Sequence, residues 1–138
     1  MKLKLFSTYT LPPYVAGVFR AIALIATLVL VHESLLPAGQ SPSLNNFDKF
    51  MHFASYCLLT GLWALAFNGR GLLKITIILT ALGFGLEVAQ HVMELGRTGS
   101  IWDALANFAG CGVAALVATR IIEADAVSPE NSAPQMTG

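Results

Sequence analysis

The chain has 138 residues, of which 55% are hydrophobic and 12% charged, and its mean hydropathy is +0.66. This apolar share is above that of ordinary soluble domains and predicts an integral membrane protein. Eight basic and eight acidic residues balance one another, so the chain has no net attraction for nucleic acid, and we expect no nucleic-acid partner.

Four uninterrupted apolar runs, each of about 17–25 residues, predict four membrane-spanning helices. They cover residues 14–31, 50–67, 72–93 and 101–122. The short polar segments "NGRG" and "ELGRTGS" predict tight hairpins between the second and third and between the third and fourth helices. The predicted fold class is therefore all-α, an integral membrane four-helix bundle in residues 1–122. Residues 123–138, rich in Pro, Ser and Ala, predict a disordered tail.

The first apolar run also resembles a signal peptide, because "MKLK" is basic and "AIALIATLVLV" is an apolar core. Against cleavage, the leading region is long, Arg20 precedes the core and no convincing small-x-small cleavage site follows. We therefore expect a retained first helix.

Lysine and arginine in the short loops predict the orientation of the bundle. With a cytoplasmic N-terminus, the inner side carries five basic residues and the outer side two: Lys2, Lys4, Arg70, Lys74 and Arg120 against Lys49 and Arg97. Arg20 can extend its side chain toward the inner surface. This split predicts that both termini are cytoplasmic.

The predicted orientation brings polar residues from three helix ends to one membrane face, the outer one. The segment "EVAQHVMELGRTGSIWDALAN" (residues 87–107) supplies most of them. The predicted layer consists of Asp48, Lys49, His52, Glu87, Gln90, His91, Arg97, Asp103 and Asn107.

Residues four apart share a helix face, which divides this layer into three lines. The lines are Asp48/His52/Tyr56, Gly83/Glu87/His91 and Asp103/Asn107/Cys111. Small residues run beside them at the same spacing: Ala81, Gly85 and Ala89, and Ala106, Gly110, Ala114 and Ala118. Because small residues let helices approach closely, we expect the third and fourth helices to pack tightly.

Most of these residues also have a purely structural interpretation. Residues 100–103, "SIWD", fit a capping box, and Asp48 suits the first turn of a helix. Gln90 and Asn107 could be interhelical hydrogen-bonding groups, and His91 could decorate a helix end. Glu87 differs, since it lies near the C-terminal end of its helix, where the dipole disfavours a carboxylate, and it needs a partner such as Arg97, Lys49 or His52.

The order and spacing of these residues resemble the VanZ-like membrane protein family. The pattern is Asp-Lys-x-x-His-Phe, then Glu-x-x-Gln, Arg, Asp and Asn-x-x-Gly, over about residues 15–122. The matching positions are Asp48, Lys49, His52, Phe53, Tyr56, Glu87, Gln90, Arg97, Ser100, Asp103, Asn107 and Gly110. His91 and the tail fall outside the pattern.

The resemblance implies a small bundle in the bacterial cytoplasmic membrane. The namesake of the family is associated with reduced susceptibility to the glycopeptide teicoplanin, and no settled reaction accompanies it. Fold and location therefore carry over from the resemblance better than activity does.

Three functions are compatible with the layer. The first is a non-enzymatic envelope protein that binds a lipid headgroup or a lipid-linked wall precursor, and a headgroup of mixed charge would disturb the internal ion pairs least. The second is an enzyme in which Glu87, Asp103 and His52 transfer protons on a lipid-linked substrate. The third is an accessory subunit of a larger membrane complex, in which the layer only locks the fold.

We expect neither a metal nor another cofactor. Cys57 and Cys111 lie inside helices without disulfide or zinc-knuckle spacing. A metal site formed by His52, Glu87 and Asp103 is chemically feasible, but no clustered His signature supports it on one helix.

Overall fold

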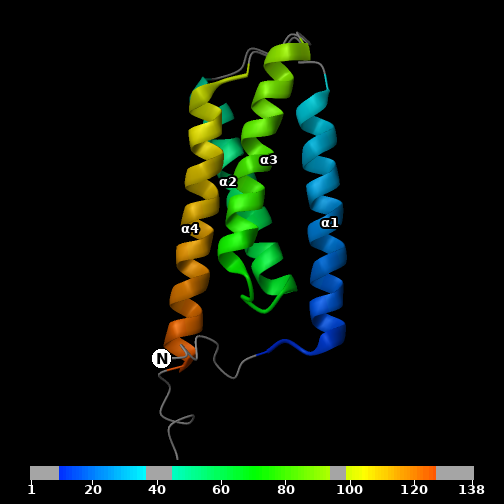
Figure 1. Ribbon diagram of the computed structural model, residues 1–138, viewed down its shortest axis with the longest axis vertical. Coiled ribbons are helices and arrows are strands. Elements are labelled where there is room, and N and C mark those ends of the chain that lie inside the picture. The colour runs from blue at the N-terminus through cyan, green and yellow to red at the C-terminus, as the bar shows by residue number, and fades with distance from the viewer. Residues whose placement is uncertain (1–9, 37–44, 94–98, 127–138) are drawn as a thin grey trace, which may run out of the picture.

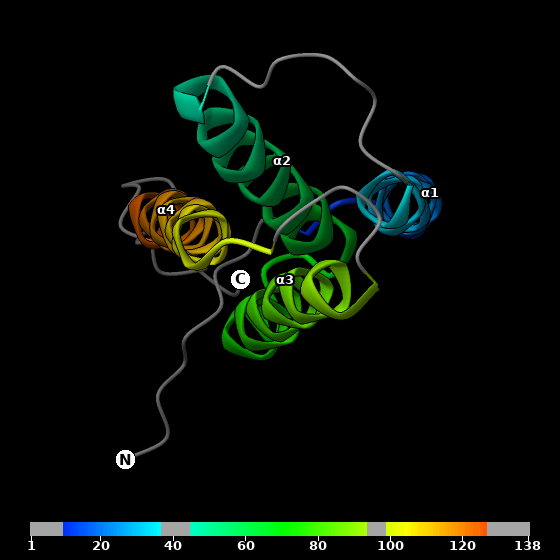
Figure 2. The same ribbon diagram turned by 90° about the horizontal axis from the view of Figure 1, so that it is seen from above.

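The computed structural model describes residues 10–36, 45–93 and 99–126 of the chain. In these residues every regular element is a helix, as the sequence predicts: α1 (Pro13–Leu35), α2 (Asn45–Ala66), α3 (Leu72–Met93) and α4 (Ile101–Ala126). The helices run alternately up and down the long axis of the molecule (Figure 1). Seen from above, α2 is inclined to the other three helices (Figure 2).

Three helices extend beyond their predicted ends. α1 continues past residue 31 to Leu35, and α2 begins at Asn45 instead of residue 50. α4 continues to Ala126, so residues 123–126, predicted as the start of the tail, are helical, and residues 127–138 lie outside the described part. The reason is that helix hydrogen bonds need no apolar side chains, so a boundary drawn at the first polar residue ends a helix too early.

α2 ends in a turn that uses left-handed backbone conformations. Asn68 has φ 54° and Gly69 has φ 70°. The Gly69 amide donates to the carbonyl of Ala64 and the Asn68 amide to that of Leu65, a Schellman motif that satisfies the last carbonyls of the helix. The Asn68 side-chain oxygen also accepts a 2.7 Å hydrogen bond from the amide of Leu11, just before α1.

Arg20 joins α1 to the same end of α2. Its Nε donates to the carbonyl of Ala66 at 3.1 Å, and its guanidinium lies 5.4 Å from the ring centroid of Phe67. A cation beside the last carbonyls of a helix is favourable for the helix dipole. We call this region, with Arg20, Ala66, Phe67, Asn68 and Gly69, the opposite end, because the polar layer lies at the other end of the bundle. On which side of a membrane Arg20 lies remains a prediction.

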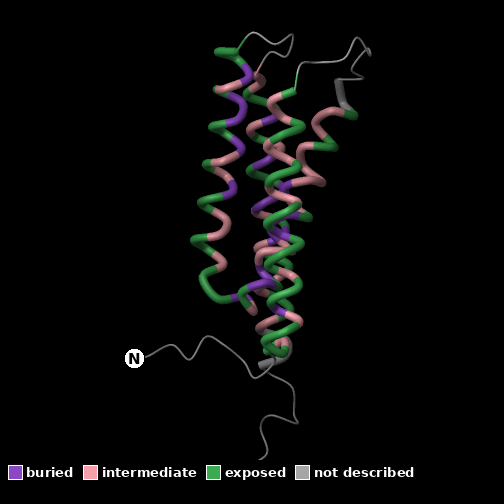
Figure 3. The backbone as a smooth tube through the Cα atoms, turned by 90° about the vertical axis from the view of Figure 1, so that its right-hand side faces the viewer, coloured by how far each residue is buried: buried purple, intermediate pink, exposed green. Residues whose placement is uncertain are grey.

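Three of the four helices are long and apolar enough to cross a membrane: α1, α3 and residues 101–122 of α4. α2, predicted as the fourth span, is not among them, since its first half carries Asp48, Lys49 and His52. Large apolar side chains cover the outer faces of the helices, and exposed positions recur along the tube in Figure 3. A bilayer supplies the apolar surroundings that such faces require.

Helices α3 and α4 were expected to pack tightly, and they do meet at Gly83 and Asn107, but the closest helix packing is between α2 and α4. A Cβ at Gly110 would meet the backbone carbonyl oxygen of Phe53 and the amide nitrogen of Cys57, so only glycine permits this approach. The predicted small-residue stripe on α3 does not face α4, because Ala81 and Gly85 are exposed and nothing lies within 4 Å of a Cβ built at Gly85. The spacing of small residues identifies a helix face that another helix could approach closely, but it does not identify which helix packs against that face.

The core between the helices is small. Tyr56, Leu59, Leu79 and Cys111 form its buried cluster. Partly buried side chains surround it: Ala26, Leu30, Trp63, Ile75 and Leu82. Because Tyr56 belongs to both this core and the Asp48/His52/Tyr56 line, the core is continuous with the polar residues above it.

Candidate functional site

One end of the bundle gathers the polar residues that the sequence predicted would meet. The start of α2, the end of α3 and the start of α4 lie there together (Figure 1). The group that we call the polar end consists of Asp48, Lys49, His52, Glu87, Asp103 and Asn107. Arg97, also predicted for this site, lies outside the described residues.

His52 is the centre of the polar end. Its Nδ1 lies 3.1 Å from Oδ1 of Asn107 and 3.7 Å from Oε1 of Glu87. Its Nε2 lies 4.0 Å from Oδ1 of Asp48, one helical turn earlier on α2. One imidazole therefore faces side chains from three helices.

Glu87 has the partners that a buried carboxylate on α3 requires. In addition to His52, its Oε2 accepts a 2.9 Å hydrogen bond from the amide of Ser100. Gly99 makes this geometry feasible, since a Cβ there would collide with the carbonyl oxygen of Glu87. The carboxylate at the end of α3 is thus held by the first residues of α4, where free amide groups favour an anion.

The predicted capping box at residues 100–103 does not form. Ser100 does cap α4, but its hydroxyl accepts a 3.2 Å bond from the amide of Trp102. The Ser100 amide, which a capping box would pair with Asp103, is taken by Glu87 instead. Asp103 is consequently free of a capping role and turns toward α2.

Asp103 and Asn107 bring α4 into the polar end, on the predicted line with Cys111, and all three are buried. Asp103 is only 7% exposed, and its Oδ1 lies 3.9 Å from Nζ of Lys49. That oxygen accepts no hydrogen bond from any residue that the structure describes. Asn107 is 2% exposed and packs against Gly83 of α3, where a Cβ would lie 3.0 Å from its Nδ2.

The remaining predicted residues have other positions. Gln90 is buried and donates through Nε2 to the carbonyl of Ser34 at 2.8 Å, which ties α3 to the end of α1 as an interhelical bond. Tyr56 is in the core. His91, predicted on the line of Glu87, is exposed.

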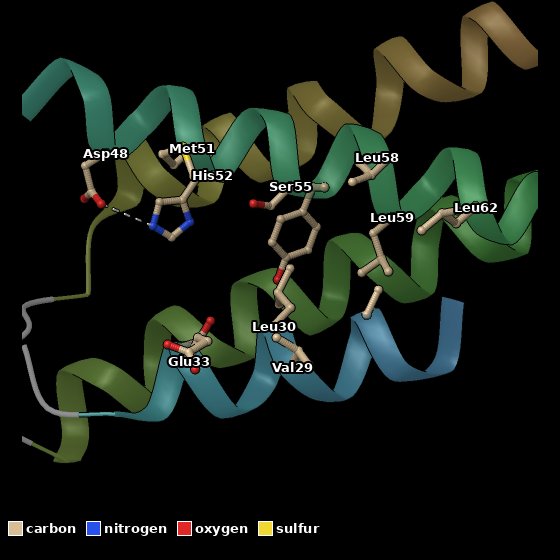
Figure 4. A pocket seen from close by; sticks show the side chains of 13 residues that line it. Val29, Leu30, Glu33, Asp48, Met51, His52, Ser55, Leu58, Leu59 and Leu62 are labelled. Carbon is tan, nitrogen blue, oxygen red and sulfur yellow. Dashed lines mark ion pairs between the residues drawn. The ribbon is translucent and has the colours of Figure 1, made fainter. Parts of the chain in front are cut away.

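A pocket of about 450 Å³ opens between α1 and α2 beside the polar end. Glu33 of α1 and Asp48 and His52 of α2 lie at one end of it, whereas Leu58 and Leu62 lie toward the other (Figure 4). The pocket therefore changes from charged to apolar along its length, and its volume is in the range of ligand-binding cavities.

The sequence did not identify the contribution of α1 to this pocket. Glu33 and Ser34 line it together with Ser55 of α2. The first apolar run was predicted to end at residue 31, so the segment "HES" fell outside the predicted helix. The signal that could have identified these residues is helical continuation, since Glu33 lies four residues after Val29, another lining residue.

The chemistry of the polar end suits binding and proton transfer. Carboxylates, an imidazole and an ammonium group lie within 4 Å of one another in pairs. Asp48, His52 and Asp103 also present ligand atoms within 4.8 Å of one another, close enough to be considered as metal ligands.

Comparison with family models, curated proteins and solved structures finds no match to this chain. Its function is therefore inferred from the geometry of the polar end and the pocket.

Proposed function

We propose that this chain is a VanZ-like protein of the bacterial cytoplasmic membrane that binds the headgroup of a lipid in the pocket between α1 and α2. The role is non-enzymatic, and the ligand is a membrane lipid or a lipid-linked wall precursor whose headgroup has both charged and uncharged polar groups. By resemblance, the cellular consequence is a change in glycopeptide susceptibility.

The observation that carries this proposal is the change of character along the pocket. Glu33, Asp48 and His52 surround one end, where a headgroup could be hydrogen-bonded. Leu58 and Leu62 provide apolar surface at the other end, where a chain could lie. A lipid has the same two parts in the same order, and a pocket lined by helices that fit a bilayer is accessible to it.

The charges around the pocket favour one class of headgroup. Glu33 and Asp48 are acidic, and His52 is the basic lining residue among the described ones. A purely anionic headgroup would face two carboxylates, whereas a zwitterionic one can direct its ammonium group toward them. We therefore expect a zwitterionic lipid such as phosphatidylethanolamine to bind more tightly than phosphatidylglycerol.

The proposal includes an orientation with both termini in the cytoplasm, which puts the polar end in the outer half of the membrane. The loop charges support it. A cysteine at Ser43 should react with an impermeant thiol reagent in intact cells, and one at Thr10, on the opposite end, should not. Labelling at position 10 but not at position 43 would show the opposite orientation. The pocket would then lie in the inner leaflet.

The test of lipid binding is native mass spectrometry of the full chain released from nanodiscs of equal phosphatidylethanolamine and phosphatidylglycerol content. We expect retained phosphatidylethanolamine in the wild type and at least a fivefold loss in Ser55→Leu, which fills the middle of the pocket between His52 and Leu58. Thr119→Leu on α4, away from the pocket, is the matched control and should retain lipid.

Three other outcomes would change the proposed binding site, the ligand or the function. Equal retention in Ser55→Leu and the wild type would contradict binding in this pocket. Extraction from native membranes with a bound wall-precursor lipid would support the precursor as ligand. Stable co-purification with larger membrane proteins, without bound lipid, would support an accessory subunit instead.

A further inference from the structure

Three side chains from two helices converge at the polar end with ligand atoms that suit a metal ion. Asp48 and His52 lie one turn apart on α2, and Asp103 lies near the start of α4. Their ligand atoms are all within 4.8 Å of one another. Ligands of a zinc ion with bonds of about 2 Å lie about 3–4 Å apart, so small side-chain rotations are enough to enclose one.

Asp103 is the first independent indication of a cation-binding site. The residue is 7% exposed, and its Oδ1 receives no hydrogen bond within the described part of the chain. The ammonium of Lys49 is 3.9 Å away, which is beyond hydrogen-bonding distance. A buried carboxylate oxygen without a hydrogen bond is costly, and a bound cation would satisfy it.

The orientation of His52 is the second indication. Its Nδ1 faces two oxygens, Oδ1 of Asn107 and Oε1 of Glu87, and a carboxylate oxygen can only accept. In the neutral imidazole the proton is therefore on Nδ1, which leaves Nε2 with a lone pair. Metal-binding histidines are held in this way, with the second ring nitrogen donating to a carbonyl or carboxylate oxygen.

The lone pair of Nε2 points toward another acceptor. Oδ1 of Asp48 lies 4.0 Å from it, so two acceptors face each other across a space too wide for a hydrogen bond. A cation between them would be attracted to both. A doubly protonated His52 would also resolve the contact, and it would leave no metal-binding capacity at Nε2.

The charges of the surrounding helices favour a dication. In the described residues of the polar end, the carboxylates of Asp48, Glu87 and Asp103 face one ammonium group, that of Lys49. With a neutral imidazole the net charge of these groups is negative. A divalent ion would balance it, and Lys49 could then form an ion pair with the second oxygen of Asp103 in place of its present contact with Oδ1.

We propose that Asp48, His52 and Asp103 bind a divalent transition-metal ion at the charged end of the pocket, with Glu87 and Asn107 orienting His52. A mixed set of one imidazole and two carboxylates suits Zn²⁺ or Mn²⁺. Because three protein ligands leave at least one position open, and Asp48 and His52 line the pocket, that position would face the pocket. The site does not depend on whether a lipid binds.

The test uses the full chain without a polyhistidine tag, in detergent, after treatment with a chelator. Zn²⁺ and Mn²⁺ are titrated separately by isothermal calorimetry, and bound metal is counted by mass spectrometry of the elements. We expect one equivalent of one of these ions, with affinity at least tenfold weaker in Asp48→Asn and in His52→Gln. X-ray absorption should show nitrogen and oxygen ligands without sulfur, which excludes the two cysteines as the binding site.

Matched controls separate the site from general effects of histidine or charge. His91→Gln and His32→Gln change exposed histidines outside the cluster and should keep the wild-type affinity. Asp103→Asn is expected to abolish binding, but its buried position makes folding a concern, whereas Asp48 is half exposed and its variant should fold. Absence of binding to the folded wild type, or an unchanged affinity in Asp48→Asn and His52→Gln, would overturn the proposal.

Discussion

The two ends of the bundle both contain polar groups that join helices, but the partners of these groups differ. At the opposite end, side chains bond to backbone: Arg20 donates to the carbonyl of Ala66, and Asn68 accepts from the amide of Leu11. At the polar end, Glu87 also accepts a bond from the backbone amide of Ser100, but other side chains there face side chains. His52 meets Asn107 and Glu87, and several of these groups are ionisable.

This difference indicates that the opposite end has a structural role, whereas the polar end is a candidate binding site. Backbone carbonyls and amides are fixed by the helices that contain them, so a side chain bonded to one can only hold the helices in place. A network of ionisable side chains can exchange partners, and Asp103 still has an oxygen without a hydrogen bond among the described residues. A buried oxygen that has no hydrogen-bond partner within the fold is available to a ligand.

The largest effect should follow from changing the spacing of α2 and α4, on which the polar end depends. Gly110→Ala puts a methyl group against the carbonyl of Phe53, and backbone cannot move aside without displacing a helix. We expect a loss of about 3 kcal/mol or more in the free energy of unfolding. Thermal and denaturant unfolding in detergent micelles would measure it.

Gly112→Ala is the control for this change, because nothing lies within 4 Å of a Cβ at that position. It should be neutral or stabilise the helix by less than about 1 kcal/mol, since alanine is the better helix former. Equal destabilisation by both variants would mean that helix propensity, and not close packing, dominates.

The two asparagines, one at each end, give the next largest effect. Asn107→Ala leaves His52 without its closest partner and opens a void beside Gly83, so we expect a loss of about 2–3 kcal/mol. Asn68→Gly keeps the left-handed conformation and loses only the bond to Leu11, a loss of about 1 kcal/mol. Chemical denaturation of both variants in one detergent would compare them, and a larger loss for Asn68→Gly would reverse the ranking of the two ends.

Glu87→Ala should cost about 2 kcal/mol, because the amide of Ser100 loses its acceptor at the start of α4. Glu87→Gln keeps an oxygen for that bond and should recover at least half of the stability, measured as the midpoint of thermal unfolding. If glutamine is no better than alanine, charge and not the hydrogen bond to Ser100 is the main contribution of Glu87.

The fold was largely predictable because its signals are local. Hydropathy identified all four helices, and their alternation brought the right helix ends together. Packing was not predictable to the same degree. The stripe with Gly85 and the line with Gly110 look alike in sequence, yet only Gly110 meets a neighbouring helix. Which of two smooth faces is covered depends on helix rotation and tilt, which spacing alone does not determine.

The sequence predicted which residues form the candidate site better than it predicted the contacts between them. The line of Asp103 and Asn107 follows from helical periodicity, and both are buried as that periodicity suggests. The bond between Glu87 and the amide of Ser100 was not expected, because a capping box competes for the same amide and sequence cannot rank the two. The predicted pair of Glu87 and Arg97 falls outside the described residues and stays a prediction.

The smallest effect on stability should come from substitution of Asp48. Comparison of this variant with a variant at the opposite end distinguishes the two ends most clearly. Its side chain is 46% exposed, so Asp48→Asn should change the free energy of unfolding by no more than about 0.5 kcal/mol. Lipid retention and metal affinity should nevertheless fall, since the lost charge lies at the pocket and beside His52. Arg20→Gln at the opposite end should do the reverse, losing about 1 kcal/mol with its bond to Ala66 while lipid retention and metal affinity stay unchanged. Unfolding, lipid mass spectrometry and calorimetry on the two variants would form one crossed comparison. If Asp48→Asn lowers the free energy of unfolding but leaves lipid retention and metal affinity unchanged, the polar end has only a structural role, as the opposite end does.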